Sequence, residues 1–158
     1  MKIKFADIND INGIRDLLLE QHTYHQKLQD QVFDKTDKFV LITDKWLLEI
    51  IESTSTHFVI CEMKQAAVGL LMFSEKKTDN DSYHTKNWLY IEEMIVADSA
   101  RRKGIGKALM IFIEDYARKK GVSIIKLDVW NNNQDAINFY LNNDYREKKI
   151  ELWKQLDE

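Results

Sequence analysis

The chain has 158 residues, of which 44% are hydrophobic and 31% charged, and its formal net charge is −3. That length suffices for one domain with its own core, so we predict a single domain over residues 1–158. The slight acidity gives no reason to expect nucleic acid or a membrane as partner, and the lone Cys61 excludes an internal disulfide, so we expect a cytoplasmic protein.

In chain order, the first half predicts a short strand, two helices and a β-hairpin. These elements are expected over residues 2–5, from Ile11 onward, over 45–53, and over 57–63 and 66–74. The two runs of the hairpin are apolar and β-rich, and they flank Lys64-Gln65, which is not a favoured turn pair. Cys61 falls inside the first run, where a buried strand residue is expected rather than a nucleophile.

The second half predicts a long buried strand, a helix, a further strand, a short helix and a final extended segment. They are expected over residues 88–96, from the glycines at 104 and 106 to 120, over 122–129, over 133–142, and over 145–156. The final segment has the pattern of one long or two short strands. This order is neither a βαβ repeat nor a strand block followed by helices, so it predicts a mixed α/β fold with helices on both faces of one sheet.

The segment from Arg101 to Ala108 has the features of a pyrophosphate site. Gly104 and Gly106 allow close approach of a ligand to the backbone where a helix begins. The first amides of a helix have no acceptor within it, and the helix dipole adds partial positive charge there. Basic side chains without an acid complete the segment, at Arg101, Arg102, Lys103 and Lys107. The sequence therefore predicts a cradle for phosphate groups.

The spacing distinguishes this loop from other phosphate-binding loops. A Walker loop is absent, and Leu109 stands where a dinucleotide fingerprint needs a small residue. Instead, Arg101, Gly104 and Gly106 form R-x-x-G-x-G after a strand that ends in an apolar triplet. The segment from Asn133 to Tyr140 adds N-x-x-A-x-x-F-Y. Both motifs and the element order resemble the GNAT N-acetyltransferase superfamily, although Asp144-Tyr145 replaces its frequent Gly-Phe.

The resemblance covers nearly the whole chain and implies the GNAT fold. That fold has a central mixed, mostly antiparallel sheet of about six to seven strands, splayed between the fourth and fifth. It also implies acetyl-CoA as the acetyl donor. The implied cofactor-binding residues are Met94, Ile95, Val96, Arg101, Arg102, Lys103, Gly104, Ile105, Gly106, Lys107, Ala108, Asn133 and Asn138. Met94 to Val96 would pair through their backbone with the pantetheine amides, as an added strand does.

Acyl transfer to an amine needs a proton acceptor for the amine and a proton donor for the leaving thiolate. Glu92 stands where several members carry an acid that faces the substrate, so we assign it the base role and keep Glu93 as its competitor. Strict alternation along the strand would put Glu92 on one face and Glu93 on the other. By resemblance, Tyr140 is the acid that protonates the thiolate.

The sequence thus predicts an N-acetyltransferase that acts on a primary amine of a small molecule or peptide. A protein or ribosomal N-terminal acetyltransferase and a non-catalytic acyl-CoA-binding domain are the alternatives, and a homodimer stays open. Acids outnumber lysines over residues 20–44, which favours a cationic amine. His22 and His25 are spaced as a metal pair, but no third ligand completes a site, so no metal is expected.

Overall fold

The computed structural model describes residues 1–28, 42–82, 84–154 and 156. They form two compact units, residues 1–128 and 129–158, and each unit is described by itself. That residues 1–158 act as a single domain stays a prediction. No helix in the described part of the chain is long and apolar enough to cross a membrane.

The elements follow the predicted order up to the last helix. The first unit contains β1 (Lys2–Phe5), η1 (Ile8–Asp10), α1 (Ile11–Leu28), α2 (Asp44–Ile51), β2 (Thr56–Met63), β3 (Ala66–Lys77), β4 (Asn87–Val96), η3 (Asp98–Ala100), α3 (Ile105–Lys119) and β5 (Ile125–Lys126). The second unit contains α4 (Gln134–Leu141).

The sheet confirms the prediction of a mixed, mostly antiparallel arrangement. Its strand order is β1-β2-β3-β4-β5, with antiparallel pairs up to β4 and a parallel pair between β4 and β5. The last pair is short, since only Leu89↔Ile125 and Tyr90↔Lys126 are in register. Beyond Tyr90, β4 and β5 no longer pair, so β4 keeps an open edge toward its carboxyl end in the described residues.

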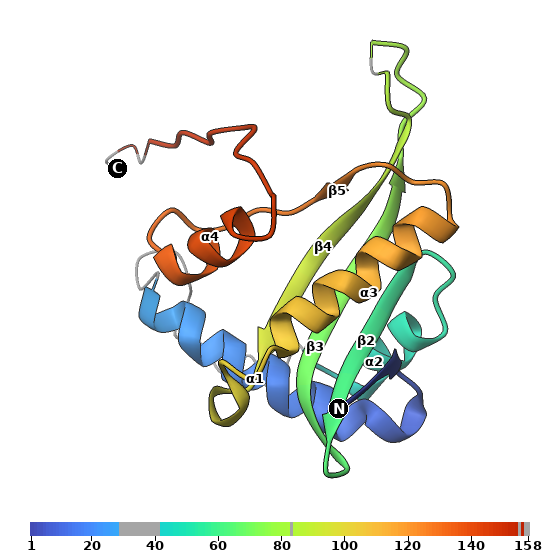
Figure 1. Ribbon diagram of the computed structural model, residues 1–158, viewed down its shortest axis with the longest axis vertical. Coiled ribbons are helices and arrows are strands. Elements are labelled where there is room, and N and C mark those ends of the chain that lie inside the picture. Colours follow the sequence, from blue (N-terminus) through green and yellow to red (C-terminus); the bar gives the residue numbers. More distant parts are fainter. Residues whose placement is uncertain (29–41, 83, 155, 157–158) are drawn as a thin grey trace. The chain divides into compact units, whose positions relative to one another are not determined.

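Helices cover both faces of this sheet in the first unit, as predicted (Figure 1). Tyr116 of α3 packs on Phe73 with ring centroids 5.1 Å apart, which assigns α3 to the face of Phe73. Trp46 of α2 packs on Phe58, whose partner in β3 is Met72, so α2 covers the opposite face. We call these the α3 face and the α1/α2 face.

Close packing of α3 on the sheet depends on a glycine in β3. A Cβ at Gly69 would lie 2.7 Å from Cγ2 of Ile105, the first residue of α3. Real contacts of that length essentially do not occur, so a side chain at this position would push the start of α3 outward. Gly69 thus fixes how closely the predicted cradle approaches the end of β4.

Three sequence predictions need correction in the described residues. The sheet has five strands rather than about six to seven. The strand expected over residues 122–129 is reduced to Ile125–Lys126, and the described residues of 145–156 contain no strand. Alternation gives a segment two distinct faces, but a strand forms only where a neighbouring edge offers a hydrogen-bond ladder.

The hairpin is confirmed, and its turn has an unusual composition. Lys64 and Gln65 both have positive φ, of 51° and 66°. Two consecutive residues in this region match the type I′ turn that fits the twist of a hairpin, where Asn and Gly are usual. The strands on either side are well buried, so strand packing sets this turn despite the unfavourable residues.

Candidate active site

The cradle predicted from the glycines lies at the N-terminus of α3. Gly104 is the N-cap residue, with a φ of 78° in the left-handed region, and Arg102 also has a positive φ, of 59°. Ala108 N–H donates to Gly104 O, so the amides of Ile105 to Lys107 have no acceptor within the helix. No heavy atom lies within 4 Å of the place a Gly104 Cβ would occupy. The loop therefore presents free amides into open space.

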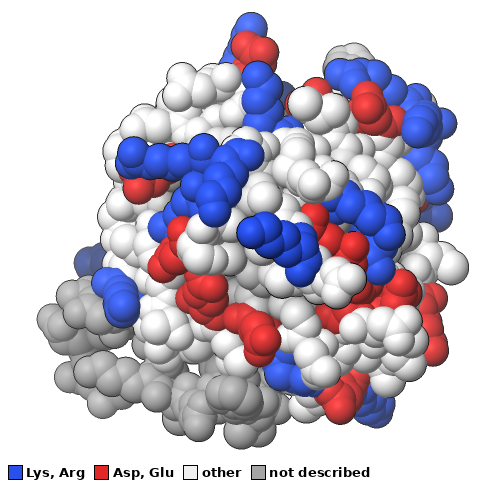
Figure 2. Space-filling model, turned by 60° about the horizontal axis from the view of Figure 1, so that its bottom comes forward, with Lys and Arg blue, Asp and Glu red and all other residues white. Residues whose placement is uncertain are grey.

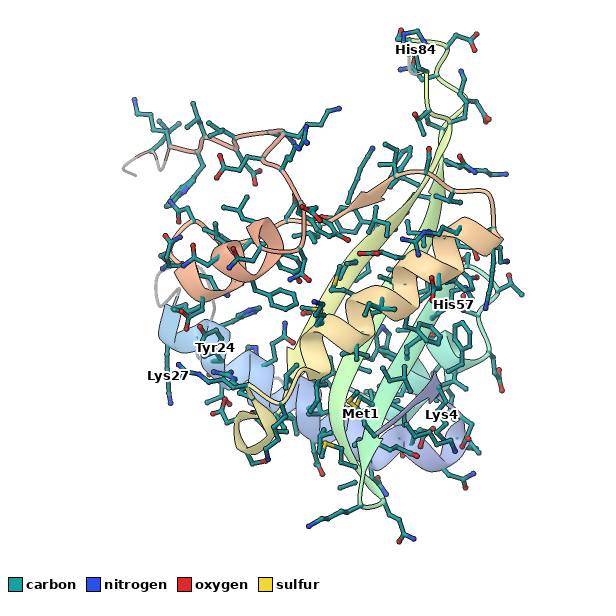
Figure 3. The ribbon with its side chains drawn as sticks, viewed as in Figure 1. Met1, Lys4, Tyr24, Lys27, His57 and His84 are labelled. Atoms are coloured by element: carbon teal, nitrogen blue, oxygen red, sulfur yellow. The ribbon has the colours of Figure 1, made fainter. Side chains whose placement is uncertain are left out.

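The four basic side chains of this segment divide into two pairs. Arg101 is engaged within the protein, because its guanidinium lies 2.7 Å from Asp98 and stacks 5.4 Å from the Tyr24 ring of α1 (Figure 3). Lys103 Nζ donates to Ser99 O at 2.9 Å. Arg102 and Lys107 are exposed, and the described residues record no ion pair for either. Arg102 and Lys107 are therefore the members of the segment whose charge the described residues leave unpaired.

Helix α1 holds the loop that leads into the cradle. Glu20 Oε1 accepts a hydrogen bond from the backbone N–H of Asp98 at 2.7 Å. Asp98 begins η3, the short turn between β4 and the cradle. A carboxylate at the start of such a turn satisfies a free amide and favours its dipole.

A β-bulge in β4 overturns the alternation expected for the two glutamates. Phe73 pairs with Ile91 and Met72 pairs with Glu93, so Glu92 is an extra residue opposite that step. Glu93 shares the α1/α2 face with Met72, and the contacts of Glu92 with Ser74 place it on the same face. The prediction that the two carboxyls lie on opposite faces is wrong, because alternation assumes a regular ladder.

Glu92 has two polar partners from β3. Ser74 Oγ donates to Glu92 Oε1 at 2.8 Å, and Lys76 Nζ lies 3.0 Å from the same oxygen. The Glu92 side chain is 29% exposed. Contacts of an ammonium and a hydroxyl with one carboxylate oxygen fix the position of the side chain.

Glu93 has a different environment. It is part-buried, and its Oε2 accepts a hydrogen bond from Gln21 Nε2 of α1. Burial, with a smaller contribution from the charge of Glu92, raises the pKa of Glu93 to about 7, against the opposing effect of the Gln21 bond. The other amide atom, Gln21 Oε1, is buried and has no hydrogen-bond partner in the described residues. The sequence did not indicate Gln21 as a site residue, because from Gln21 onward the apolar residues no longer recur at helical spacing.

A surface hollow of about 330 Å³ adjoins Glu92. Its lining residues come from β3, β4 and β5, and they are Lys76, Trp88, Tyr90, Glu92 and Lys126. An aromatic wall with one carboxylate and two ammonium groups can bind a small polar molecule. The hollow and the free edge of β4 from Met94 to Val96 lie in the same unit as the cradle.

The second unit contains the other predicted site residues. Asn133 caps α4 by accepting from Ala136 N–H at 3.3 Å, and Asn138 Oδ1 accepts from Gln134 Nε2 at 3.0 Å. Tyr140 is buried, with its ring centroid 5.6 Å from that of Tyr145. The cofactor and acid roles of these residues stay predictions.

The remaining predictions concern residues outside the site. Cys61 is fully buried in β2, and burial raises the pKa of its thiol, as expected for a core residue. His22 and His25 lie on α1, and the described residues contain no group of three potential metal ligands. Most of the acidic segment at 20–44 lies outside the described residues. On the face shown in Figure 2, basic and acidic side chains are interspersed.

Sequence relatives of the chain are N-acetyltransferases. It is 30% identical over 121 residues to an uncharacterized N-acetyltransferase of Methanocaldococcus jannaschii, covering 77% of this chain and 51% of that protein. It is 31% identical over 74 residues to the aminoalkylphosphonate N-acetyltransferase of Salmonella typhimurium, covering 46% of this chain and 48% of that protein. The chain thus spans about half the length of the curated relatives it matches.

Solved structures share the fold at low sequence identity. A mutant of a Bacillus halodurans protein superposes with a TM-score of 0.90 at 20% identity, covering 99% of both chains. An aminoglycoside N-acetyltransferase in complex with CoA has a TM-score of 0.74 at 13% identity, covering 99% of this chain and 100% of that one. The model of the acetyltransferase (GNAT) family matches residues 11–145. With the cradle, the sheet order and this match, the chain belongs to the acetyltransferase (GNAT) family.

Proposed function

We propose that the protein is an acetyl-CoA-dependent N-acetyltransferase that acetylates a primary amine of a small molecule. One observation carries the proposal. Strand β4 presents two carboxyls with different environments at its bulge and then leads, through η3, into a cradle for phosphate groups. The family match and relatives named for amine acetylation support it.

The residues present fit coenzyme A. Free amides at the start of α3, the open space at Gly104 and the exposed side chains of Arg102 and Lys107 would hold its pyrophosphate. The free edge of β4 from Met94 to Val96 would pair with the amides of its pantetheine arm. When bound, acetyl-CoA supplies an acetyl group as a thioester.

The reaction is a direct acyl transfer. The substrate ammonium loses a proton, and the neutral amine forms a C–N bond to the thioester carbonyl carbon. The C–S bond then breaks, the nitrogen loses its second proton, and the thiolate takes up a proton, so the products are an amide, free coenzyme A and one released proton. This chain must therefore supply a proton acceptor near the amine and a donor near the sulfur.

The contacts favour Glu93 over Glu92 as the proton acceptor. Lys76 and Ser74 both contact Oε1 of Glu92, whereas burial raises the pKa of Glu93 to about 7. General bases are most effective when their pKa lies near the working pH. Gln21 Oε1 is buried and has no donor in the described residues. It would accept a hydrogen bond from the ammonium group of the substrate. Tyr140 would be the proton donor.

The test separates cofactor binding from transfer. Calorimetry should detect coenzyme A binding to the wild type. Mass spectrometry should detect labelled acetyl groups on members of a pooled amine library. A Glu92→Gln/Glu93→Gln double variant should bind coenzyme A normally and transfer far more slowly. No coenzyme A binding by a folded wild-type protein would refute the proposal, and unchanged transfer in the double variant would refute the role of the carboxyls.

A further inference from the structure

The hollow beside Glu92 has an uneven charge. Of its two lysines, Lys76 is neutralised by the Glu92 carboxylate, 3.0 Å away. Lys126 of β5 is exposed, and the described residues record no carboxylate within ion-pair distance of it. Its ammonium lies 3.6 Å from the centroid of the Trp88 ring instead. The lining therefore has one cation in excess.

The acid that follows Lys126 along the chain, Asp128, is engaged by another residue. Asp128 lies two residues beyond Lys126 and accepts a hydrogen bond from the Tyr90 hydroxyl. Burial, together with this bond, raises the pKa of Tyr90, so the phenol stays a neutral donor. Tyr90 thus fixes Asp128 at the edge of the hollow, and Asp128 is not one of its lining residues.

We propose that the acceptor is an amine that also carries an acid group, a carboxylate or a phosphonate, and that Lys126 beside Trp88 binds this group. The proposal rests on the acetyltransferase function and specifies its substrate class. The amine end would lie at the Glu92 end of the hollow. The alkyl chain of the substrate, between its amine and its acid group, would lie along the rings of Tyr90 and Trp88, which form the apolar wall of the hollow.

The strand register gives the separation of the two ends. Tyr90 is in register with Lys126, and Glu92 lies two residues further along β4, a rise of roughly 7 Å. Trp88, which the Lys126 ammonium covers, lies four residues from Glu92, a rise of roughly 13 Å. A molecule whose amine and acid groups are joined by a short alkyl chain can span a separation between these two distances. A compact polycation would bring a second positive charge to Lys126.

The other explanation for Lys126 is packing alone. The face of an aromatic ring attracts a cation, and this attraction can fix the Lys126 side chain without any ligand. Packing alone predicts no selectivity between acids and amines. An acid site predicts selectivity that depends on the charge of Lys126.

Three amines of equal chain length separate these explanations. They are ε-aminocaproate, which carries an acid, hexamethylenediamine, which carries a second amine, and hexylamine, which carries neither. We expect the largest kcat/KM for ε-aminocaproate and the smallest for hexamethylenediamine. The phosphonate analogue of ε-aminocaproate, assayed beside it, tells which acid group is preferred.

Variants of Lys126 test the origin of the selectivity. Lys126→Met removes the charge and keeps the length, and the preference for ε-aminocaproate over hexylamine should fall about three- to tenfold. Lys126→Glu should reverse the preference toward hexamethylenediamine. Lys45→Met removes the same charge from an exposed position on α2 and is the matched control.

A binding measurement keeps this proposal separate from the catalytic one. Caproate has no amine, so its affinity, measured by calorimetry with coenzyme A present, reports the acid site without turnover. Caproate binding that weakens in Lys126→Met but not in Lys45→Met supports the acid site even if none of the amines is acetylated. Caproate that does not bind, or binds equally well to Lys126→Met, overturns the acid site even where amines are acetylated. A preference for hexamethylenediamine also overturns it.

Discussion

Glu92 and Glu93 are neighbours in the sequence, yet their contacts give the two carboxyls different chemistry. The bulge turns both to the α1/α2 face, where Glu92 meets Lys76 and Glu93 meets Gln21. One carboxyl is paired with an ammonium, and burial raises the pKa of the other to about 7. Two acids with separate roles in one site need this difference of environment.

The pH dependence of the rate should identify the proton acceptor. Glu93 accepts a proton only when ionised, so kcat/KM should rise as the pH passes about 7. Glu93→Gln should lose that limb and lower the rate roughly 100- to 10,000-fold. Glu92→Gln should keep the limb and move it to lower pH, because the charge of Glu92 raises the pKa of Glu93. A limb near pH 7 that survives in Glu93→Gln and disappears in Glu92→Gln would return the base role to Glu92.

The same carboxyl predicts a pH-dependent stability. Its pKa rises from 4.5 to about 7 on folding, so the folded state binds this proton more tightly than the unfolded state. The protonated carboxyl therefore favours the folded state below pH 4.5, and this contribution is lost as the pH rises to about 7. Glu93→Gln has no such titration. The Tm of Glu93→Gln minus that of the wild type should therefore be larger in mildly alkaline buffer than in acidic buffer. Glu49→Gln is the surface control. A Tm difference that does not change with pH would contradict a buried, titrating Glu93.

At the level of elements, the two glycines of the cradle have different physical requirements. Gly104 has a φ of 78°, which a residue with a side chain adopts only with strain, so Gly104→Val would disturb the loop as well as the ligand. Gly106 lies within α3, where its backbone is helical and glycine is less favourable than alanine. Gly106 is therefore not required by the backbone.

This difference makes Gly106→Ala the cleaner test of the cradle. We expect its Tm to equal or exceed that of the wild type, since alanine gains up to about 1 kcal/mol in a helix. Its affinity for coenzyme A should fall, because a methyl group would keep the pyrophosphate away from the amides. Gly104→Ala should lower the Tm, with a cost of about 1–2 kcal/mol for a side chain in the left-handed region. Thermal melts and calorimetry on both variants measure the two effects, and unchanged affinity in Gly106→Ala would argue against close approach at this residue.

The local parts of this site could be predicted from the sequence, and the parts that depend on pairing could not. The cradle is contiguous, so its glycines and basic residues indicate a phosphate site without knowledge of the fold. The bulge depends on a mismatch between β3 and β4, and the strand pattern of residues 88–96 contains no sign of it. Gln21 lies far from Glu93 in the sequence, and only the packing of α1 on the sheet brings them together. Lys64 and Gln65 form the turn because the flanking strands pair, not because of their own preference.

For the whole molecule, the proposed site residues divide between the two units. The cradle, both glutamates and the hollow belong to residues 1–128, whereas Tyr140 belongs to residues 129–158. The family match at 11–145 extends across both units. The first unit alone thus provides groups for binding and for proton removal. Protonation of the leaving group is the step for which the proposed chemistry requires the second unit.

Tyr140→Phe tests that requirement because it keeps the buried ring and removes only the hydroxyl. A positioned acid contributes roughly 100- to 10,000-fold to the rate, so turnover should fall within that range while coenzyme A affinity holds. His57 lies on β2 and His84 at the tip of the arm between β3 and β4, and the family resemblance gives neither residue a role in protonation (Figure 3). Tyr145→Phe, which removes the same group from the neighbouring ring, is the matched control. If Tyr140 is only structural, Tyr140→Phe should lower the Tm and leave turnover per folded molecule unchanged. Measuring Tm, affinity and turnover on one preparation of each variant distinguishes a residue that acts in the transition state from one that only packs.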